Sequence, residues 1–326
     1  MISNIAPPQI RATTGLELAA GLFARCSAEL ASQLKITLTS GKKQGKQTPL
    51  SIGINGDVYG GMRGPIEVGM KRVDIAYVNP SAVVAMAHRG KGYYKQKMEL
   101  RVLAAFPSWD RIAIVVSKNL GVRSLHDIRR RKIPVRVSTR FSGVNNATYY
   151  TVSTILSFYG LSFEKIKRWG GKVQECPQPF APERLKGIAS HSLDAVFDEG
   201  VSTVGGWLDQ ALDNGYEILS LEPKIIKKLE PMGYQRSVLP KSRYRQLKED
   251  AATLDFSGWT LVTHRWLPNR VAYAAVETID ERKEVIPVDD DEPLNMRALC
   301  LSTEKCPLQV PLHPGARKYY TEKGYL

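Results

Sequence analysis

The sequence has 326 residues, of which 43% are hydrophobic and 24% charged, and its formal net charge at pH 7 is +14. This length supplies ample material for a buried core and favours two domains over one. Charged residues interrupt the longest apolar stretches, so no segment approaches the roughly 20 apolar residues that a membrane-spanning helix requires. The composition therefore excludes direct membrane insertion and indicates a soluble globular protein.

Stretches with strand-like and helix-like hydrophobic patterns alternate along the chain. Strands are predicted at residues 9–15, 34–39, 50–54, 73–78, 100–106, 111–117, 134–139, 171–174, 193–197, 217–221 and 257–263. Helices are predicted at residues 16–34, 65–70, 82–88, 124–130, 145–159, 182–189, 207–214, 224–232 and 269–280. The remainder is loop, including a tail rich in Pro, Gly and Tyr. This alternation predicts an α/β fold.

Three of these predicted strands end abruptly in polar residues. The first is followed by Asn79-Pro80-Ser81 and then at once by a helix, and the others end in Ser138-Thr139-Arg140 and Asp198-Glu199-Gly200. Sheets of α/β proteins bind ligands at the carboxyl ends of their strands, where helix N-termini offer free N–H groups. The sequence therefore predicts three binding loops, although Asn-Pro is also a common turn initiator.

Arg140 is the predicted anion clamp. A carboxylate placed there would meet the hydroxyls of Ser138 and Thr139, the guanidinium of Arg140, and the N-terminus of a helix that begins near Asn145. The alternative is an arginine held in a surface salt bridge.

Asp198 and Glu199 are predicted to accept a ligand ammonium or hydroxyl group, or to act as a general base. Adjacent strand residues point to opposite faces, so only one of them can face a ligand, and Asp198 is favoured. The alternative is an ion pair with a nearby Lys or Arg.

Aromatic residues close to the strand ends are candidates for the walls of a site or for core packing. They are Tyr77, Trp109 and Trp259, with the acidic neighbour Asp110. Thr13 and Thr14, at the end of the first strand, are weaker candidates for binding.

The four cysteines, Cys26, Cys176, Cys300 and Cys306, show neither a Cys-x-x-Cys pair nor a histidine at zinc-ligand spacing. We expect free thiols, no metal and no cofactor, with a Cys300–Cys306 bridge conceivable only in an oxidising compartment. The start of the sequence does not resemble a secretory signal. We expect a cytoplasmic protein as written, and a periplasmic one if the recorded N-terminus lacks its signal.

The positive charge attracts anions in general: nucleic acid, acidic lipid or an acidic small molecule. Its densest run, Arg129-Arg130-Arg131-Lys132, lies at the end of a predicted helix, where the helix dipole favours cations. No basic face with interleaved aromatic residues and no known nucleic-acid motif occurs. We therefore expect a small organic acid as ligand and no nucleic-acid partner.

Five segments carry a resemblance to a known family, and together they extend over most of the chain. They are residues 73–81, 106–112, 135–140, 194–200 and 311–324, the last containing Pro-Leu-His-Pro-Gly-Ala. In order and spacing these segments resemble the TAXI-type solute receptors associated with TRAP transporters, which are type II periplasmic binding proteins. The chain departs from that family in having only Thr13-Thr14-Gly15 where a glycine-rich first loop is usual.

The resemblance implies two lobes, each a mixed sheet flanked by helices, with two crossover strands forming a hinge and a ligand cleft between the lobes. Lobe one would comprise residues 1–115 and 262–326, and lobe two residues 116–261. The membrane subunits of a TRAP transporter would be partners if the protein is exported.

These observations predict a solute-binding protein that captures a small anionic organic compound, a carboxylate or an amino acid, by hinge closure and without covalent chemistry. The alternative is a cytosolic enzyme on the same fold, a decarboxylase or other lyase acting on an organic acid, with Asp198 as its catalytic residue.

Overall fold

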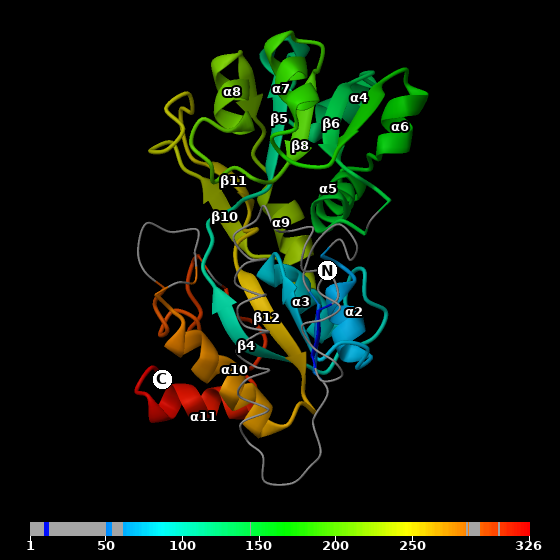
Figure 1. Ribbon diagram of the computed structural model, residues 1–326. Coiled ribbons are helices and arrows are strands. Elements are labelled where there is room, and N and C mark those ends of the chain that lie inside the picture. The colour runs from blue at the N-terminus through cyan, green and yellow to red at the C-terminus, as the bar shows by residue number, and fades with distance from the viewer. Residues whose placement is uncertain are drawn as a thin grey trace. The chain divides into compact units, whose positions relative to one another are not determined.

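The chain divides into two compact units. The computed structural model describes residues 10–12, 50–53, 61–143, 145–284, 286, 294–305 and 307–326. Unit 1 comprises Met1–Trp109 and Ser257–Leu326, and unit 2 comprises Asp110–Phe256. Each unit is described by itself below (Figure 1).

Unit 1 is built on a mixed five-stranded sheet. In spatial order its strands are β1 (Ile10–Ala12), β2 (Leu50–Gly53), β3 (Ile75–Val78), β12 (Trp259–His264) and β4 (Leu100–Phe106). The first three are parallel, and β12 runs antiparallel to both of its neighbours. Since β12 comes from the second half of the chain, this sheet is complete only when both segments of unit 1 are present.

In the part of unit 1 that the structure describes, four helices cover the sheet. They are α2 (Gly64–Gly69), α3 (Ser81–Arg89), α10 (Asn269–Glu281) and α11 (Pro314–Glu322). The first two pack against β3 and β12, whereas α10 and α11 lie side by side next to β4, in orange and red (Figure 1). Residues 81–87 of α3 are all buried, which explains the continuous apolar run in its sequence.

Unit 2 has a second mixed sheet of five strands. Their spatial order is β7 (Lys172–Cys176), β6 (Arg136–Arg140), β8 (Ala195–Asp198), β5 (Ala113–Ser117) and β9 (Tyr216–Ile218). The β7, β6 and β8 strands are parallel, and β5 is antiparallel to β8 and β9. The carboxyl ends of β6 and β8 therefore lie at the same edge of the sheet.

A two-stranded antiparallel ribbon completes the strands of unit 2. It consists of β10 (Arg236–Leu239) and β11 (Ala251–Leu254). Ile112 N donates to Leu254 O at 3.2 Å, and Leu221 N donates to Ala252 O at 2.8 Å. These bonds attach the ribbon to the segments that flank β5 and β9.

Helices and two short 3₁₀ turns surround these strands. They are η1 (Lys118–Leu120), α4 (Leu125–Arg131), α5 (Ala147–Phe158), α6 (Phe163–Arg168), α7 (Pro182–Ala189), α8 (Trp207–Asp213), α9 (Pro223–Leu229) and η2 (Glu230–Met232). Side chains of Ser124, Asn146 and Ser162 cap the N-termini of α4, α5 and α6, as N-cap Ser and Asn residues commonly do.

The structure confirms the α/β class and most of the predicted elements from residue 65 onward. The β5 strand lies in the sheet of unit 2 and β12 in that of unit 1. The chain passes between the units at Trp109/Asp110 and Phe256/Ser257, and the division into lobes stays a prediction. The elements predicted for residues 16–39 lie outside the described residues, as do Cys26 and Cys306, while Cys176 and Cys300 are buried free thiols.

Candidate functional site

In unit 1, β3 leads directly into α3 through Asn79-Pro80-Ser81, with a cis bond before Pro80. Asn79 Nδ2 donates to Gly258 O at 3.3 Å, and Ser81 N donates to Ser257 O at 3.1 Å. The loop is therefore held against the residues that precede β12. Among the described residues, nothing hydrogen-bonds the buried Oγ of Ser81, and no side chain caps α3.

The aromatic candidates of unit 1 have different environments. Tyr77 is fully buried, and its ring centroid lies 5.4 Å from that of Phe106, so it packs in the core. Trp259 and Trp109 are half-buried, Trp259 at the start of β12 and Trp109 at the end of the first segment of the unit. Thr13 and Thr14 lie outside the described residues.

In unit 2, Arg140 lies at the carboxyl end of β6 and forms an ion pair with Glu199, which follows β8. The Arg140 Nη1 to Glu199 Oε1 distance is 3.0 Å, and the two side chains are only 13% and 15% exposed. The Nε atom of Arg140 is buried and has no hydrogen-bond partner in the part of the chain that the structure describes. One N–H group of this guanidinium is thus left for another acceptor.

Asp198 is completely buried and forms an ion pair with Arg184, which is also completely buried. Arg184 Nε donates to Ser138 Oγ at 3.0 Å, and Thr139 Oγ1 donates to Phe197 O at 3.0 Å. The structure therefore places Asp198, Ser138 and Thr139 in a buried polar network behind the strand ends. Asp198 and Glu199 therefore both form ion pairs with an arginine, which was the alternative to ligand binding for these two residues.

Asp110, which the sequence suggests only as part of a wall, belongs to the Arg140–Glu199 cluster. Its carboxylate accepts hydrogen bonds from Arg111 N at 2.8 Å, Gly200 N at 3.0 Å and Val201 N at 3.1 Å. Burial, followed by the negative charge of Glu199 and a hydrogen bond with its side chain, raises the pKa of Asp110 well above the usual range. The protonated form of Asp110 is therefore favoured next to Arg140 and Glu199.

Asn145 is not the residue that begins α5. The side chain of Asn146 caps that helix by accepting from Tyr149 N at 3.0 Å. Asn145 is exposed and has a left-handed φ of 53°. The predicted start of the helix at residue 145 is two residues before Ala147, because either asparagine suits the composition of a cap and only the backbone distinguishes them.

Of the predicted residues in unit 2, Arg140 and Glu199 come together at one strand edge, and Asp110 joins them. Asp110 lies far from Arg140 and Glu199 in sequence. The sequence signal for its place in this cluster is only that an acidic residue precedes β5, a strand of the same sheet. Among the described residues, no group of three or more His, Cys, Asp or Glu side chains is arranged to hold a metal ion. The same residues contain no helix long and apolar enough to cross a membrane.

The chain is an α/β protein with two mixed sheets, and polar residues end several of its strands. Its first unit is formed by two separate segments of the chain, and its second unit by one continuous segment. The chain belongs to the NMT1-like family, whose model matches residues 66–324.

Several solved structures show a distant likeness to this chain. XAC2383 from Xanthomonas citri bound to ATP aligns at 8% identity and a TM-score of 0.46, covering 96% of this chain and 94% of that one. A binding-protein component of a phosphonate ABC transporter from Pseudomonas aeruginosa aligns at 10% identity and a TM-score of 0.39, with coverages of 85% and 74%. The periplasmic binding protein BugD aligns at 14% identity and a TM-score of 0.38, with coverages of 84% and 82%. Because these TM-scores are below 0.5, the fold is inferred from the sheet topology of this chain alone.

Proposed function

We propose that this protein is a solute-binding protein that captures a small organic anion without transforming it. The observation that carries the proposal is the state of Arg140. It is nearly buried at a strand edge, it is fixed through Nη1 by Glu199, and it retains a buried Nε with no partner among the described residues. An oxyanion accepting from Nε would satisfy this donor.

The raised pKa of Asp110 supports an anionic ligand. If both carboxyl groups were ionised, the cluster would carry one cation and two anions and would repel an incoming carboxylate. A neutral Asp110, which its burial favours, would leave one cation and one anion in the cluster. The arrangement therefore avoids the repulsion that two neighbouring negative charges would cause.

Unit 1 offers a second place for an oxyanion. The N-terminus of α3 carries the partial positive charge of the helix dipole, has no side-chain cap, and presents the buried hydroxyl of Ser81, which lacks a partner among the described residues. Asn79 precedes it on the same loop. These features suit a carboxylate, sulfonate or phosphonate group equally, so they support the anionic class of ligand without selecting one head group.

The experiment is a thermal-shift screen of dicarboxylates, amino acids, aromatic acids, sulfonates and phosphonates, followed by calorimetric titration of the hits. Arg140→Gln should weaken a true ligand by about 2 to 5 kcal/mol, as expected for loss of a buried charged contact. The matched control is Arg136→Gln, because Arg136 lies on the same strand, pairs with Asp194 at 2.6 Å and is 44% exposed. Equal affinities of R140Q and R136Q for every hit would refute the assignment.

Chemistry on the ligand was the alternative prediction, with Asp198 as its catalytic residue. Asp198 is completely buried and paired with Arg184, so its carboxyl group is not accessible to a substrate in this structure. We therefore propose binding alone. Recovery of a hit unchanged after prolonged incubation supports this, and its consumption by the native protein contradicts it.

The finer classification follows from the sequence resemblance and is part of the proposal. We propose a TAXI-type receptor that delivers its ligand to the membrane subunits of a TRAP transporter. Such a role requires export, so fractionation of cells that produce the native protein provides the test. Recovery from the periplasm supports the receptor role, and recovery from the cytosol alone contradicts delivery to a transporter.

A further inference from the structure

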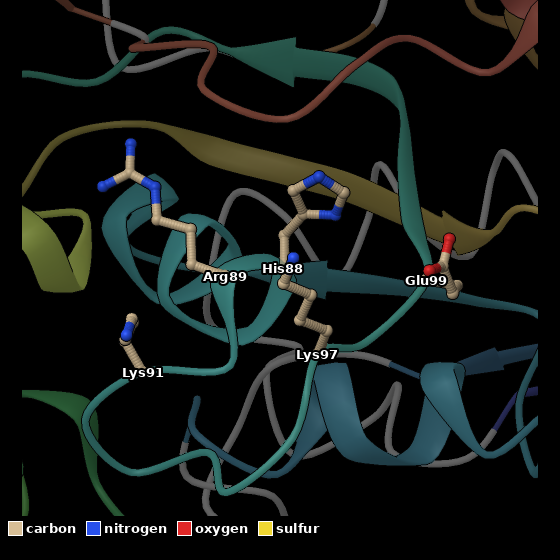
Figure 2. A pocket seen from close by; sticks show the side chains of 5 residues that line it. All are labelled: His88, Arg89, Lys91, Lys97 and Glu99. Carbon is tan, nitrogen blue, oxygen red and sulfur yellow. The ribbon is translucent and has the colours of Figure 1, made fainter.

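A basic pocket lies in unit 1 at the C-terminal end of α3. Its volume is about 480 Å³, and it is lined by His88, Arg89, Lys91, Lys97 and Glu99 (Figure 2). This volume lies within the roughly 300–1,000 Å³ typical of small-molecule sites. Four of the five lining side chains are basic residue types. Ser81 begins α3 and Arg89 ends it, so the helix separates this pocket from the Asn79–Ser81 loop by about 12 Å at 1.5 Å per residue.

The loop that forms the pocket is fixed by backbone contacts. Lys91 N donates to Met86 O at 3.1 Å, Met98 N donates to Ala87 O at 2.9 Å, and Tyr94 Oη donates to Met62 O at 2.6 Å. Gly90 has a left-handed φ of 62°, and a Cβ atom there would lie 2.6 Å from Lys97 N. The loop therefore folds back tightly onto the end of α3, and both lysines start from a fixed backbone.

Existing interactions neutralise the acidic side chain of the pocket but not its lysines. Glu99 pairs with Arg265 at 3.3 Å, and Arg89 Nη2 donates to Gln309 Oε1 at 2.8 Å. Within the described part of the chain, the ammonium groups of Lys91 and Lys97 have no hydrogen bond or ion pair. Figure 2 shows Lys97 extending toward the last turn of α3, which carries His88.

Cations at a helix C-terminus also have an ordinary structural role, because they offset the helix dipole. That dipole amounts to roughly half an elementary charge, whereas the pocket carries Arg89, Lys91 and Lys97. The carbonyls of Met86 and Ala87 are moreover already satisfied by the backbone N–H groups of the loop. The positive charge therefore exceeds what the end of α3 requires.

A pocket in unit 2 provides an internal comparison. It has a volume of about 510 Å³ and is lined by His126, Asp127, Arg129 and Arg130. There, Arg130 pairs with Asp127 at 2.9 Å, and Arg129 Nη1 donates to Tyr159 O at 3.5 Å. Both arginines are engaged by the protein itself, so among the described residues the unit 2 pocket has no counterpart of Lys91 and Lys97.

We propose that the unit 1 pocket binds a multiply charged phosphate group, in addition to the solute site proposed above. Lysine ammonium groups act as point charges that suit phosphate oxygens. His88 adds a polar group, because its Nδ1 atom is buried and has no partner among the described residues. Its pKa is lowered mainly by burial, and a bound anion next to it would favour the protonated imidazole.

The test is calorimetric titration of the full chain with inorganic pyrophosphate at low and physiological salt. Lys91→Gln/Lys97→Gln should weaken binding at least tenfold. Lys95→Gln is the matched control, because Lys95 is an exposed lysine of the same loop that does not line the pocket. Equal weakening by Lys95→Gln, or no weakening by the double variant, would overturn the proposal in favour of diffuse attraction to a basic protein.

Two further comparisons establish whether this pocket is independent of the solute site and where its phosphate comes from. Arg140→Gln should leave pyrophosphate binding unchanged and weaken only the organic anion, whereas loss of both would overturn the claim of two sites. A phosphate group can also come from a lipid, so phosphatidylcholine vesicles with and without phosphatidic acid are compared in a flotation assay. Flotation that depends on phosphatidic acid and on both lysines identifies a lipid head group, and its absence alongside pyrophosphate binding identifies a soluble phosphate.

Discussion

At the scale of single residues, the buried pair of Arg184 and Asp198 shows why a polar strand end is not always a ligand contact. Both side chains are completely inaccessible, and Glu199 N donates to Asp198 Oδ1 at 2.7 Å. Asp198→Asn would leave the arginine charge buried without its counter-ion, so we expect a loss of about 3 to 5 kcal/mol in the free energy of unfolding. Urea denaturation at pH 7 measures it.

The control for this prediction is Glu99→Gln, which removes an ion pair whose partners are 43% and 51% exposed. Solvent and salt screen such pairs, so its cost should remain under about 1 kcal/mol. Similar losses in Asp198→Asn and Glu99→Gln would show that burial of the Arg184–Asp198 pair has no energetic consequence.

The raised pKa of Asp110 predicts a pH dependence of stability. Between its ordinary pKa of 3.8 and its higher value in the folded protein, the folded state holds a proton that the unfolded state has released. Stability therefore falls as pH rises through this interval, by at most about 1.4 kcal/mol per pH unit. Asp110→Asn removes this contribution.

Urea denaturation of the native protein and Asp110→Asn between pH 4 and pH 8 tests this dependence. The difference in the free energy of unfolding, native minus variant, should decrease as pH rises above about 4. A difference that does not change with pH would contradict the raised pKa.

At the scale of elements, the N-terminus of α5 allows the stability effects of substituting two adjacent residues, Asn145 and Asn146, to be compared. Asn146→Ala removes the acceptor for Tyr149 N and should cost about 1 kcal/mol in the free energy of unfolding. Asn145→Gly should cost less, because glycine tolerates the left-handed φ of 53° at that position. If the glycine substitution is the more damaging of the two, the helix begins at Asn145, as the sequence pattern predicts.

The closing motif, Pro311-Leu-His-Pro-Gly-Ala316, has a structural role. His313 Nδ1 accepts from Gly315 N at 3.2 Å and so caps α11, and a Cβ on Gly315 would lie 2.1 Å from Asn269 O. Gly315 is therefore required where α11 crosses the start of α10. Gly315→Ala should cost about 1 to 3 kcal/mol through overpacking.

Thermal or urea denaturation measures this cost, with Gly143→Ala as the control. No atom of the described residues lies within 4 Å of a Cβ at Gly143, so the same chemical change should be nearly neutral there. A neutral Gly315→Ala would mean that α10 and α11 approach less closely than this structure shows.

The sequence predicted best those helices whose hydrophobic spacing and terminal residues indicate the same bounds. Residues 182–189 form α7 as predicted, and α4, α5 and α10 lie within one or two residues of their expected bounds. Among the described residues, four helices and strands were missed, namely α6, β10, β11 and α11, together with the short 3₁₀ turn η1. The first is a short, basic helix, the ribbon strands pair across a long connection, and α11 is stabilised by tertiary contacts such as Tyr319 Oη donating to Asp280 Oδ2 at 2.8 Å.

The candidate site was predictable only in part for the same reason. Arg140 and Glu199 end strands that are recognisable from local patterns, whereas the contribution of Asp110 depends on how β5 pairs with β8, which no local pattern specifies. The Arg184–Asp198 ion pair could not be predicted from the sequence either, because Asp198 pairs with an arginine only as a result of its complete burial in the folded protein. Strand ends were thus predictable, and the partners of their side chains were not.

At the scale of the whole molecule, the order of segments predicts that the two units differ in their ability to fold alone. Unit 2 is one continuous segment, and its five-stranded sheet, its ribbon and its helices all come from Asp110–Phe256. Unit 1 is different, because β12 lies between β3 and β4 and comes from the segment after unit 2. A fragment of residues 1–109 would have β3 and β4 without the strand that pairs with both.

We therefore expect a fragment of residues 110–256 to fold cooperatively, with a sigmoidal urea transition and dispersed amide NMR signals, because domains of this length bury enough surface to be stable. The fragment of residues 1–109 should show neither property. Mixing it with a fragment of residues 257–326 should restore structure if the missing β12 is the cause. A folded 1–109 fragment, or a disordered 110–256 fragment, would show that the stability of each unit is not set by the completeness of its own sheet.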